Sequence, residues 1–328
     1  MSLFSRFNSC ITDACGSYAS GQNHNGSLAV LTFHRVLANP DPLLPTEPDS
    51  RRFTAIVKML SERFRILSLS EACQLLFSGK LPPRSVCITF DDGYANNLEV
   101  ALPILKSFKA PATVFVAPGF LNGGIMFNDI VIETIRRSES LLDLSHLDLG
   151  RFKIIDTKSK LNAIESIISR IKHFPPEKRE LTIAEITKEA STNLPTNLML
   201  SDPQVQQLNR NGIEIGAHTM THPILASIDQ STAMHEVMDS KLYLESLLNT
   251  KITAFAYPNG KPHRDYSDTH VQIAKSCGFE IALTTSWGTA TMSSDHMQIP
   301  RIAPWDKTPF GYMLRIVRSY RQRRFPIV

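Results

Sequence analysis

The chain has 328 residues, of which 42% are hydrophobic and 20% are charged, and this composition excludes a disordered protein. Its formal net charge of +4 arises at the C-terminal end, where five arginines follow Lys307. Because nucleic-acid binding would need basic residues across a broad face, we expect no nucleic-acid partner. The five cysteines are not in metal-ligand spacing, and no apolar run reaches the roughly 18 residues of a membrane span.

Residues 1–27 are rich in Gly, Ser and Asn. Such a segment cannot build a core, so we predict a flexible leader over 1–27 and a folded domain over 28–328. The leader lacks the apolar stretch of a signal peptide. With neither a signal peptide nor a membrane span, the sequence favours a cytoplasmic location.

After the leader, short apolar runs alternate with helical patterns. Runs typical of buried strands occur at 28–34, 66–69, 86–90, 112–116, 213–217, 252–260, 280–285 and 298–302. Apolar residues at helical spacing lie between most of them, for example at 51–64, 97–108 and 231–248. This alternation predicts an α/β fold built from βα units around a parallel sheet or barrel.

Two segments depart from the alternation. Residues 121–200 carry helical patterns and little strand signal, so we predict a helical insertion there. The C-terminal residues predict a basic helix over about 309–324. The simpler interpretation of its arginines, Arg315 to Arg324, is that they keep the helix soluble, and the alternative is a peripheral contact with an anionic membrane.

Four of the predicted strands end in reactive or turn-forming residues. They are His34, the pair Asp91 and Asp92, the pair His218 and His222, and the turn Tyr257-Pro258-Asn259-Gly260. In a barrel of parallel strands, all such C-terminal ends open on the same face, where barrel active sites lie. For Asp91 and Asp92 taken alone, a simple Asp-Gly turn that caps the next helix is the alternative.

His218 and His222 stand four residues apart, a spacing that brings both imidazoles to one side of a short helical turn, where they could share a divalent ion. A carboxylate from Asp91 or Asp92 would complete a ligand set with open positions for water. The other aspartate would stay free to take a proton from that water.

Three segments resemble the motifs of a known family, the polysaccharide deacetylases, also called the NodB-homology family or carbohydrate esterase family 4. Thr89-Phe90-Asp91-Asp92-Gly93-Tyr94 is similar to the first motif and His218-Thr219-Met220-Thr221-His222 to the second. Phe255-Ala256-Tyr257-Pro258-Asn259-Gly260 resembles the third in a variant form. The resemblance runs from about Leu28 to Asp306. It implies a distorted (β/α) barrel, here with about seven parallel strands, and metal-dependent removal of N-acetyl groups from amino sugars.

By this resemblance, Asp92, His218 and His222 hold the divalent metal and Asp91 is the general base. Zinc is the metal that we expect first, with cobalt and nickel as alternatives. The family's third motif carries an arginine that braces the catalytic aspartate, and here that arginine is missing. Arg301 and Arg35 are the two candidates to replace it, and the sequence does not choose between them.

The family's last motif, which supplies a histidine as general acid, is also missing from its usual place near the C-terminus. His296 lies near that place but does not match the motif. Leu31-Thr32-Phe33-His34 resembles a histidine motif that stands at the front of the domain in the biofilm poly-N-acetylglucosamine deacetylases. We therefore predict that His34 is the general acid.

The predicted reaction is acyl transfer to water. Asp91 removes a proton from the attacking water, a backbone N–H near Tyr94 helps to hold the oxyanion, and His34 protonates the departing amine. The predicted substrate is a polysaccharide, an oligosaccharide or a lipid-linked precursor, bound by Tyr94, Tyr257, Pro258, Asn259 and Trp305. Two alternatives stay open: a family member that binds glycan without turning it over, and a hydrolase of another non-peptide C–N bond.

Overall fold

The structure is a computed structural model that describes residues 26–138, 140–189, 193–303, 306–322 and 324–328. The predicted leader lies outside the described residues except for Gly26 and Ser27, and Ser27 already begins the first strand.

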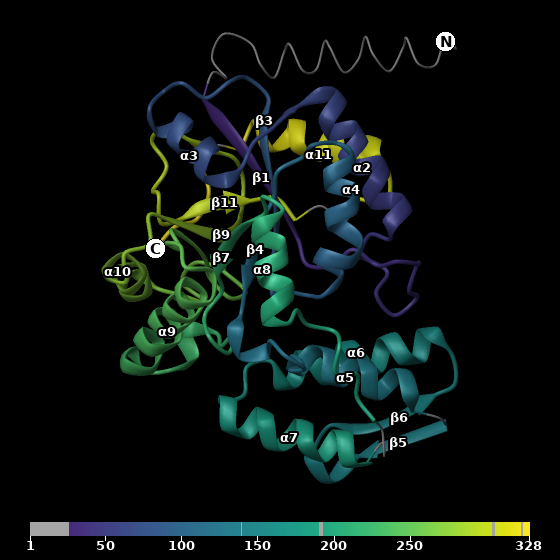
Figure 1. Ribbon diagram of the computed structural model, residues 1–328. Helices are drawn as coiled ribbons and strands as arrows, with labels where there is room; N and C mark the ends of the chain where they lie inside the picture. Colours follow the sequence, from purple (N-terminus) through teal and green to yellow (C-terminus); the bar gives the residue numbers. More distant parts are fainter. Residues whose placement is uncertain (1–25, 139, 190–192, 304–305, 323) are drawn as a thin grey trace, which may run out of the picture.

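Parallel strands form a barrel at the centre of the molecule (Figure 1). Each strand of the barrel pairs in parallel with the next. In spatial order they are β1 (Ser27–Phe33), β3 (Ser85–Phe90), β4 (Thr113–Val116), β7 (Glu214–Ala217), β8 (Ala254–Ala256), β9 (Ile281–Trp287) and β11 (Ile299–Arg301). The predicted (β/α) barrel of about seven parallel strands is thereby confirmed.

The barrel closes between its first and last strands. The N–H of Thr32 donates to the carbonyl oxygen of Ile302 over 3.0 Å. The N–H of Ile302 donates in turn to the carbonyl oxygen of Val30 over 2.8 Å. Two short strands, β2 (Arg65–Ile66) and β10 (Ala290–Thr291), extend the sheet to nine strands, with β10 antiparallel to β1.

Side chains from the barrel strands alternate between two hydrophobic cores. In β1, Ala29, Leu31 and Phe33 pack in a core shared with the outer helices, whereas Leu28 and Val30 belong to a second core shared with α3 (Leu69–Phe77). Because both faces are buried, the strands appear in the sequence as continuous apolar runs.

Helices surround the barrel (Figure 1). They are α2 (Ser50–Arg63), α4 (Leu102–Ser107), α8 (Asp202–Arg210), α9 (Gln230–Leu248), α10 (Asp268–Ser276) and α11 (Pro309–Ser319). The basic helix α11 packs on α2 and ends at Ser319, so Arg321 and Arg324 follow it instead of extending it as the sequence predicted. Among the described residues, no helix has the length and apolar character needed to cross a membrane.

The segment between β4 and α8 forms a separate cluster at one end of the molecule (Figure 1). It contains α5 (Phe127–Arg137), α6 (Thr157–Ile171) and α7 (Pro176–Glu189), which share a hydrophobic core of their own. It also contains an antiparallel hairpin of β5 (Ser140–Leu144) and β6 (Gly150–Ile154), which the sequence analysis did not predict. Strands this short carry too few alternating positions to stand out from the helical patterns around them.

Candidate active site

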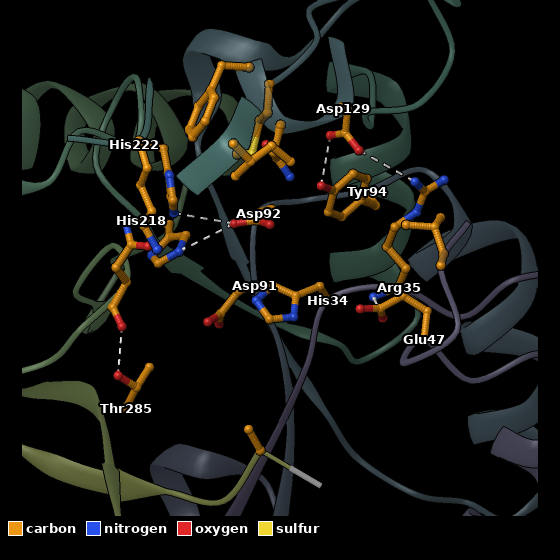
Figure 2. A pocket seen from close by; sticks show the side chains of 18 of the residues that line it. His34, Arg35, Glu47, Asp91, Asp92, Tyr94, Asp129, His218, His222 and Thr285 are labelled. Carbon is orange, nitrogen blue, oxygen red and sulfur yellow. Dashed lines mark hydrogen bonds and ion pairs between the residues drawn. The ribbon is translucent and has the colours of Figure 1, made fainter. Parts of the chain in front are cut away.

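The carboxyl ends of the barrel strands open on a pocket of about 560 Å³, a size typical of small-molecule sites. The predicted site residues that line it are His34, Arg35, Asp91, Asp92, Tyr94, His218, His222, Asn259 and Arg301. Figure 2 shows several of them converging from different strands. Helix α5, helix α6 and the residue after α6 supply another part of the wall, including Phe127, Asp129 and Lys172.

Asp92, His218 and His222 form a compact set of metal-binding groups. Each histidine places Nε2 3.5 Å from Oδ1 of Asp92, and one donor atom from each residue lies within 4.8 Å of the others. Ligands bound about 2.0–2.1 Å from a shared ion at tetrahedral angles lie about 3.4 Å apart. The spacing of the three side chains therefore fits a zinc-like divalent ion.

The protonation states of these groups also suit a metal. Nδ1 of His218 lies 2.7 Å from the carbonyl oxygen of Ala256, which fixes the proton on Nδ1 and leaves the Nε2 lone pair free. Burial lowers the pKa of His222 to about 4 despite the nearby charge of Asp92, so this imidazole is neutral at pH 7. Burial would raise the pKa of Asp92, but the two histidines beside it, His218 first, lower it below its ordinary value.

The backbone around the metal-binding groups adopts unusual conformations. Asp92, Thr219 and His222 have positive φ values of 75°, 60° and 55°, a region that non-glycine residues rarely adopt and that is enriched at functional sites. The predicted helical turn between His218 and His222 is therefore wrong, because these φ values and Pro223 are incompatible with a helix. Gly93, at φ 87°, supplies the sharp turn after Asp92.

Glu236 of α9 holds the loop between the two histidines. Its carboxylate accepts hydrogen bonds from the backbone N–H groups of Met220 over 2.8 Å and Thr221 over 2.7 Å, and from the Thr221 hydroxyl over 2.6 Å. The loop is therefore fixed from outside the pocket.

Asp91 is paired with Arg301. Nη1 of Arg301 donates to Oδ1 of Asp91 over 2.6 Å, its Nε donates to the carbonyl oxygen of Thr284 over 3.0 Å, and both charged side chains are buried. Burial would raise the pKa of Asp91, but the charge of Arg301, the largest opposing influence, lowers it. Arg301, and not Arg35, thus lies where an arginine bracing Asp91 would be expected.

His34 lies in the same pocket, near Asp91 and Asp92 (Figure 2). Its side chain is exposed toward the pocket, and the partial loss of hydration beside the surrounding protein atoms lowers its pKa. The negative charges of Asp92, Glu47 and Asp91 outweigh this effect and raise the pKa of His34 above its ordinary value. The ring is therefore placed to carry a proton near the two aspartates.

Arg35 contributes to a second polar cluster, on the wall formed by α5. Its guanidinium lies over the ring of Tyr94, 4.6 Å from the centroid, and 3.6 Å from Oδ1 of Asp129. The hydroxyl of Tyr94 donates to Oδ2 of Asp129 over 2.8 Å (Figure 2). Burial raises the pKa of Asp129 to about 6, and the opposing effects of Arg35 and Tyr94 are smaller.

Some predicted substrate contacts lie elsewhere. Tyr257 is fully buried in the core that the barrel shares with the outer helices. Its ring stacks on that of Tyr266, with 4.1 Å between the ring centroids, and neither Tyr257 nor Pro258 lines the pocket. The turn after β8 therefore directs Tyr257 into the core and leaves Asn259 at the pocket. Trp305 lies outside the described residues, and His296 stacks on Phe77 instead of reaching the pocket.

Four charged residues of the pocket were not predicted from the sequence as members of the site: Glu47, Asp129, Lys172 and Lys261. None of them belongs to a motif, and Asp129 and Lys172 fall within or beside helical patterns where charged residues usually face solvent. Trp287 also lines the pocket; from the sequence, stacking on a sugar ring and packing in the core or at its rim were equal alternatives for this residue.

Comparison with known proteins agrees with this geometry. A family model described as polysaccharide deacetylase matches residues 78–137 and 177–282, together half of the chain. The chain belongs to the polysaccharide deacetylase family.

Individual polysaccharide deacetylases are distant in sequence. YxkH of Bacillus subtilis, named as a polysaccharide deacetylase, is 22% identical over 277 residues, which is 84% of this chain and 70% of that protein. The poly-beta-1,6-N-acetyl-D-glucosamine N-deacetylase of Staphylococcus epidermidis is 26% identical over 159 residues, 46% of this chain and 54% of that one. The structure of the Streptococcus pyogenes deacetylase PplD in complex with acetate shares the fold, with a TM-score of 0.59, 21% identity and coverage of 88% of this chain and 98% of the other.

Proposed function

We propose that this polysaccharide deacetylase is a metal-dependent hydrolase that removes N-acetyl groups from an amino-sugar glycan. The observation that carries the proposal is the arrangement of one pocket. A carboxylate and two imidazoles converge there, directly beside the buried Asp91–Arg301 pair and His34. Ligands, base and acid for amide hydrolysis are thus within reach of one bound group.

Asp92, His218 and His222 would hold the metal. When bound, a divalent ion there would polarise the acetamide carbonyl and lower the pKa of a water molecule. Two imidazoles and one carboxylate suit zinc best, with cobalt and nickel as further candidates.

Asp91 acts as the general base. The charge of Arg301 keeps its pKa low, so the carboxylate is ionised and able to accept a proton at neutral pH. The hydrogen bonds that Arg301 makes to Asp91 and to Thr284 fix the orientation of this carboxylate toward the pocket. Such positioning lowers the entropic cost of proton transfer.

His34 acts as the general acid. An amine is a poor leaving group unless it is protonated as the C–N bond breaks. The carboxylates around His34 raise its pKa, which favours the protonated imidazole that can supply this proton. Acetate and a free amino sugar are the products.

The glycan is an N-acetylated polysaccharide, an oligosaccharide or a lipid-linked precursor. Support for an amino sugar comes from the name of the Staphylococcus epidermidis relative, and support for acetate as product comes from the PplD deacetylase, whose structure is a complex with acetate. Trp287 and Asn259 on the pocket wall offer an aromatic face and an amide for contact with a sugar ring.

The test compares the metal content and the acetate release of three proteins on a panel of N-acetylated amino-sugar oligomers. The parent protein should contain a divalent ion and release acetate. Asp91→Asn should retain the ion and lose acetate release by a factor of at least about 10², whereas Asp92→Asn should lose both. An ion without acetate from any oligomer would contradict the proposal and indicate a glycan-binding protein instead.

A further inference from the structure

Two lysines at the pocket have no place in the chemistry proposed above. Lys172 directly follows α6, and Lys261 follows the turn after β8, yet both line the pocket that contains Asp91 and Asp92. Within the described residues, no hydrogen bond or ion pair involves either ammonium group.

The surroundings of these lysines are rich in positive charge. Burial lowers the pKa of Lys172, the charge of Asp265 opposes this, and the charges of Arg264 and Lys261 lower it further. Asp265, the acid nearby, is itself engaged, because it accepts from the backbone N–H of Lys261 over 3.0 Å and lies 3.7 Å from Nε of Arg264. Positive charge therefore exceeds negative charge at this part of the wall.

Among the described residues, no acid of the pocket forms an ion pair with Lys172 or Lys261, and each acid interacts with another group. Asp91 pairs with Arg301, Asp129 with Arg35 and Tyr94, and Glu47 accepts from the backbone of Arg35 over 3.2 Å. Asp92 belongs to the metal-binding set.

A lysine at the end of a helix often only stabilises the helix dipole, and that role would account for Lys172 alone. It does not account for a second lysine, from a loop some 90 residues away in sequence, at the same pocket. Two like charges on the wall of one pocket repel each other, and an anion bound between them would offset that repulsion.

We propose that Lys172 and Lys261 form a subsite for an anionic group, a phosphate or a carboxylate, carried by the glycan beside the amino sugar that is deacetylated. This inference rests on the proposed function, because it assigns the substrate class of the same pocket. The insertion would then set specificity, since it supplies Lys172.

The test uses one N-acetylated amino-sugar oligomer in three forms: neutral, phosphate-bearing and carboxylate-bearing. The variant is Lys172→Glu/Lys261→Glu. The matched control is Lys153→Glu/Lys158→Glu, which changes the same charge on two exposed lysines of the insertion that do not line the pocket. The parent protein should have a KM about tenfold lower for an anionic form than for the neutral form at low salt, and added salt should reduce the difference.

The Lys172→Glu/Lys261→Glu variant should lose this preference, so that its KM for an anionic form is no longer lower than its KM for the neutral form, while the control keeps the preference. The better of the two anionic forms identifies the group. Equal KM values for all three forms in the parent protein would overturn the subsite and leave the deacetylase activity standing.

A binding measurement separates the two proposals. The three oligomers are titrated into the Asp91→Asn variant with and without the two lysine substitutions, so that no turnover is needed. If an anionic form binds in a salt-sensitive way and this binding disappears with the lysine substitutions, the subsite is supported. If the parent protein nevertheless releases no acetate, the proposed hydrolase is contradicted while the subsite stands. Binding that does not distinguish the three forms would overturn the subsite whatever the activity.

Discussion

Arg301 donates a hydrogen bond to Asp91 over 2.6 Å although 210 residues separate them in the sequence. The closure of the barrel creates this contact, because β11 pairs with β9 and the residue after β11 pairs with β1, which lies next to β3. The last strand of the chain is thereby placed where it can support a side chain that follows β3.

The first prediction concerns this buried ion pair. Arg301→Met leaves the carboxylate of Asp91 buried without its partner, so the free energy of unfolding should fall by about 3–5 kcal/mol. Deacetylation should also fall, by at least about 10², because the base loses its orientation. Urea unfolding and acetate release measure the two effects.

The double variant Arg301→Met/Asp91→Asn is the control for the stability effect. It removes both charges, so it should recover much of the lost stability while remaining inactive, and the double-mutant cycle gives the coupling energy. Strict additivity of the two single substitutions would show that the contact contributes nothing to stability.

The sequence could predict the strand ends but not which of them touch. Asp91 follows a continuous apolar run, so its place at a strand end was predictable from the pattern alone. Arg35 follows a predicted strand and Arg301 lies near the end of another, and only the order of strands around the barrel decides that Arg301 meets Asp91. Strand order is a long-range property that local patterns do not encode.

Two other residues show the same limit. Asp129 lies in a helical pattern whose charged residues would usually face solvent, and only the packing of α5 against the barrel end brings it to Tyr94. Tyr257 follows a strand in a motif-like turn, which suggested a substrate contact. Its ring instead stacks on Tyr266 in the core, because a strand-end residue can turn to either side.

The second prediction tests His34 as general acid. His34→Asn should lower kcat on N-acetylated sugars by about 10²–10⁴, because the amine then leaves without a proton. On p-nitrophenyl acetate, whose leaving group needs no proton, the loss should be much smaller. Metal content should be unchanged, which a metal assay of the same samples checks. An equal loss on both substrates would instead assign His34 to binding or to folding.

The third prediction concerns the loop that presents the two histidines. Glu236→Ala removes the acceptor for the N–H groups of Met220 and Thr221, so the affinity for the metal should fall about 10–100-fold. A chelator competition titration measures this affinity, and excess metal should restore most of kcat. Asp239→Ala, at an exposed acid of the same helix, should leave the affinity unchanged. If both variants bind metal as the parent does, the loop does not depend on Glu236.

The fourth prediction is a dependence of stability on pH that arises from Asp129. Burial, the largest influence, raises its pKa to about 6, against about 3.9 in an unfolded chain. Between these values the native state binds more protons than the unfolded state, so this residue makes the protein less stable as pH rises from about 4 to 6. The loss is complete above pH 6 and amounts to about 3 kcal/mol.

Asp129→Asn removes this titration while keeping an acceptor for the Tyr94 hydroxyl. The variant should therefore gain stability relative to the parent protein as pH rises through this range, measured by urea unfolding at several pH values with the metal content held constant. Asp143→Asn is a suitable control, because its exposed carboxyl has a lowered pKa through its hydrogen bonds to Ser145 and should act in the opposite direction. The stability difference between Asp129→Asn and the parent protein could instead be the same at every pH in this range. That result would show that Asp129 is ionised in the native state over the whole range, held so by Arg35 at 3.6 Å.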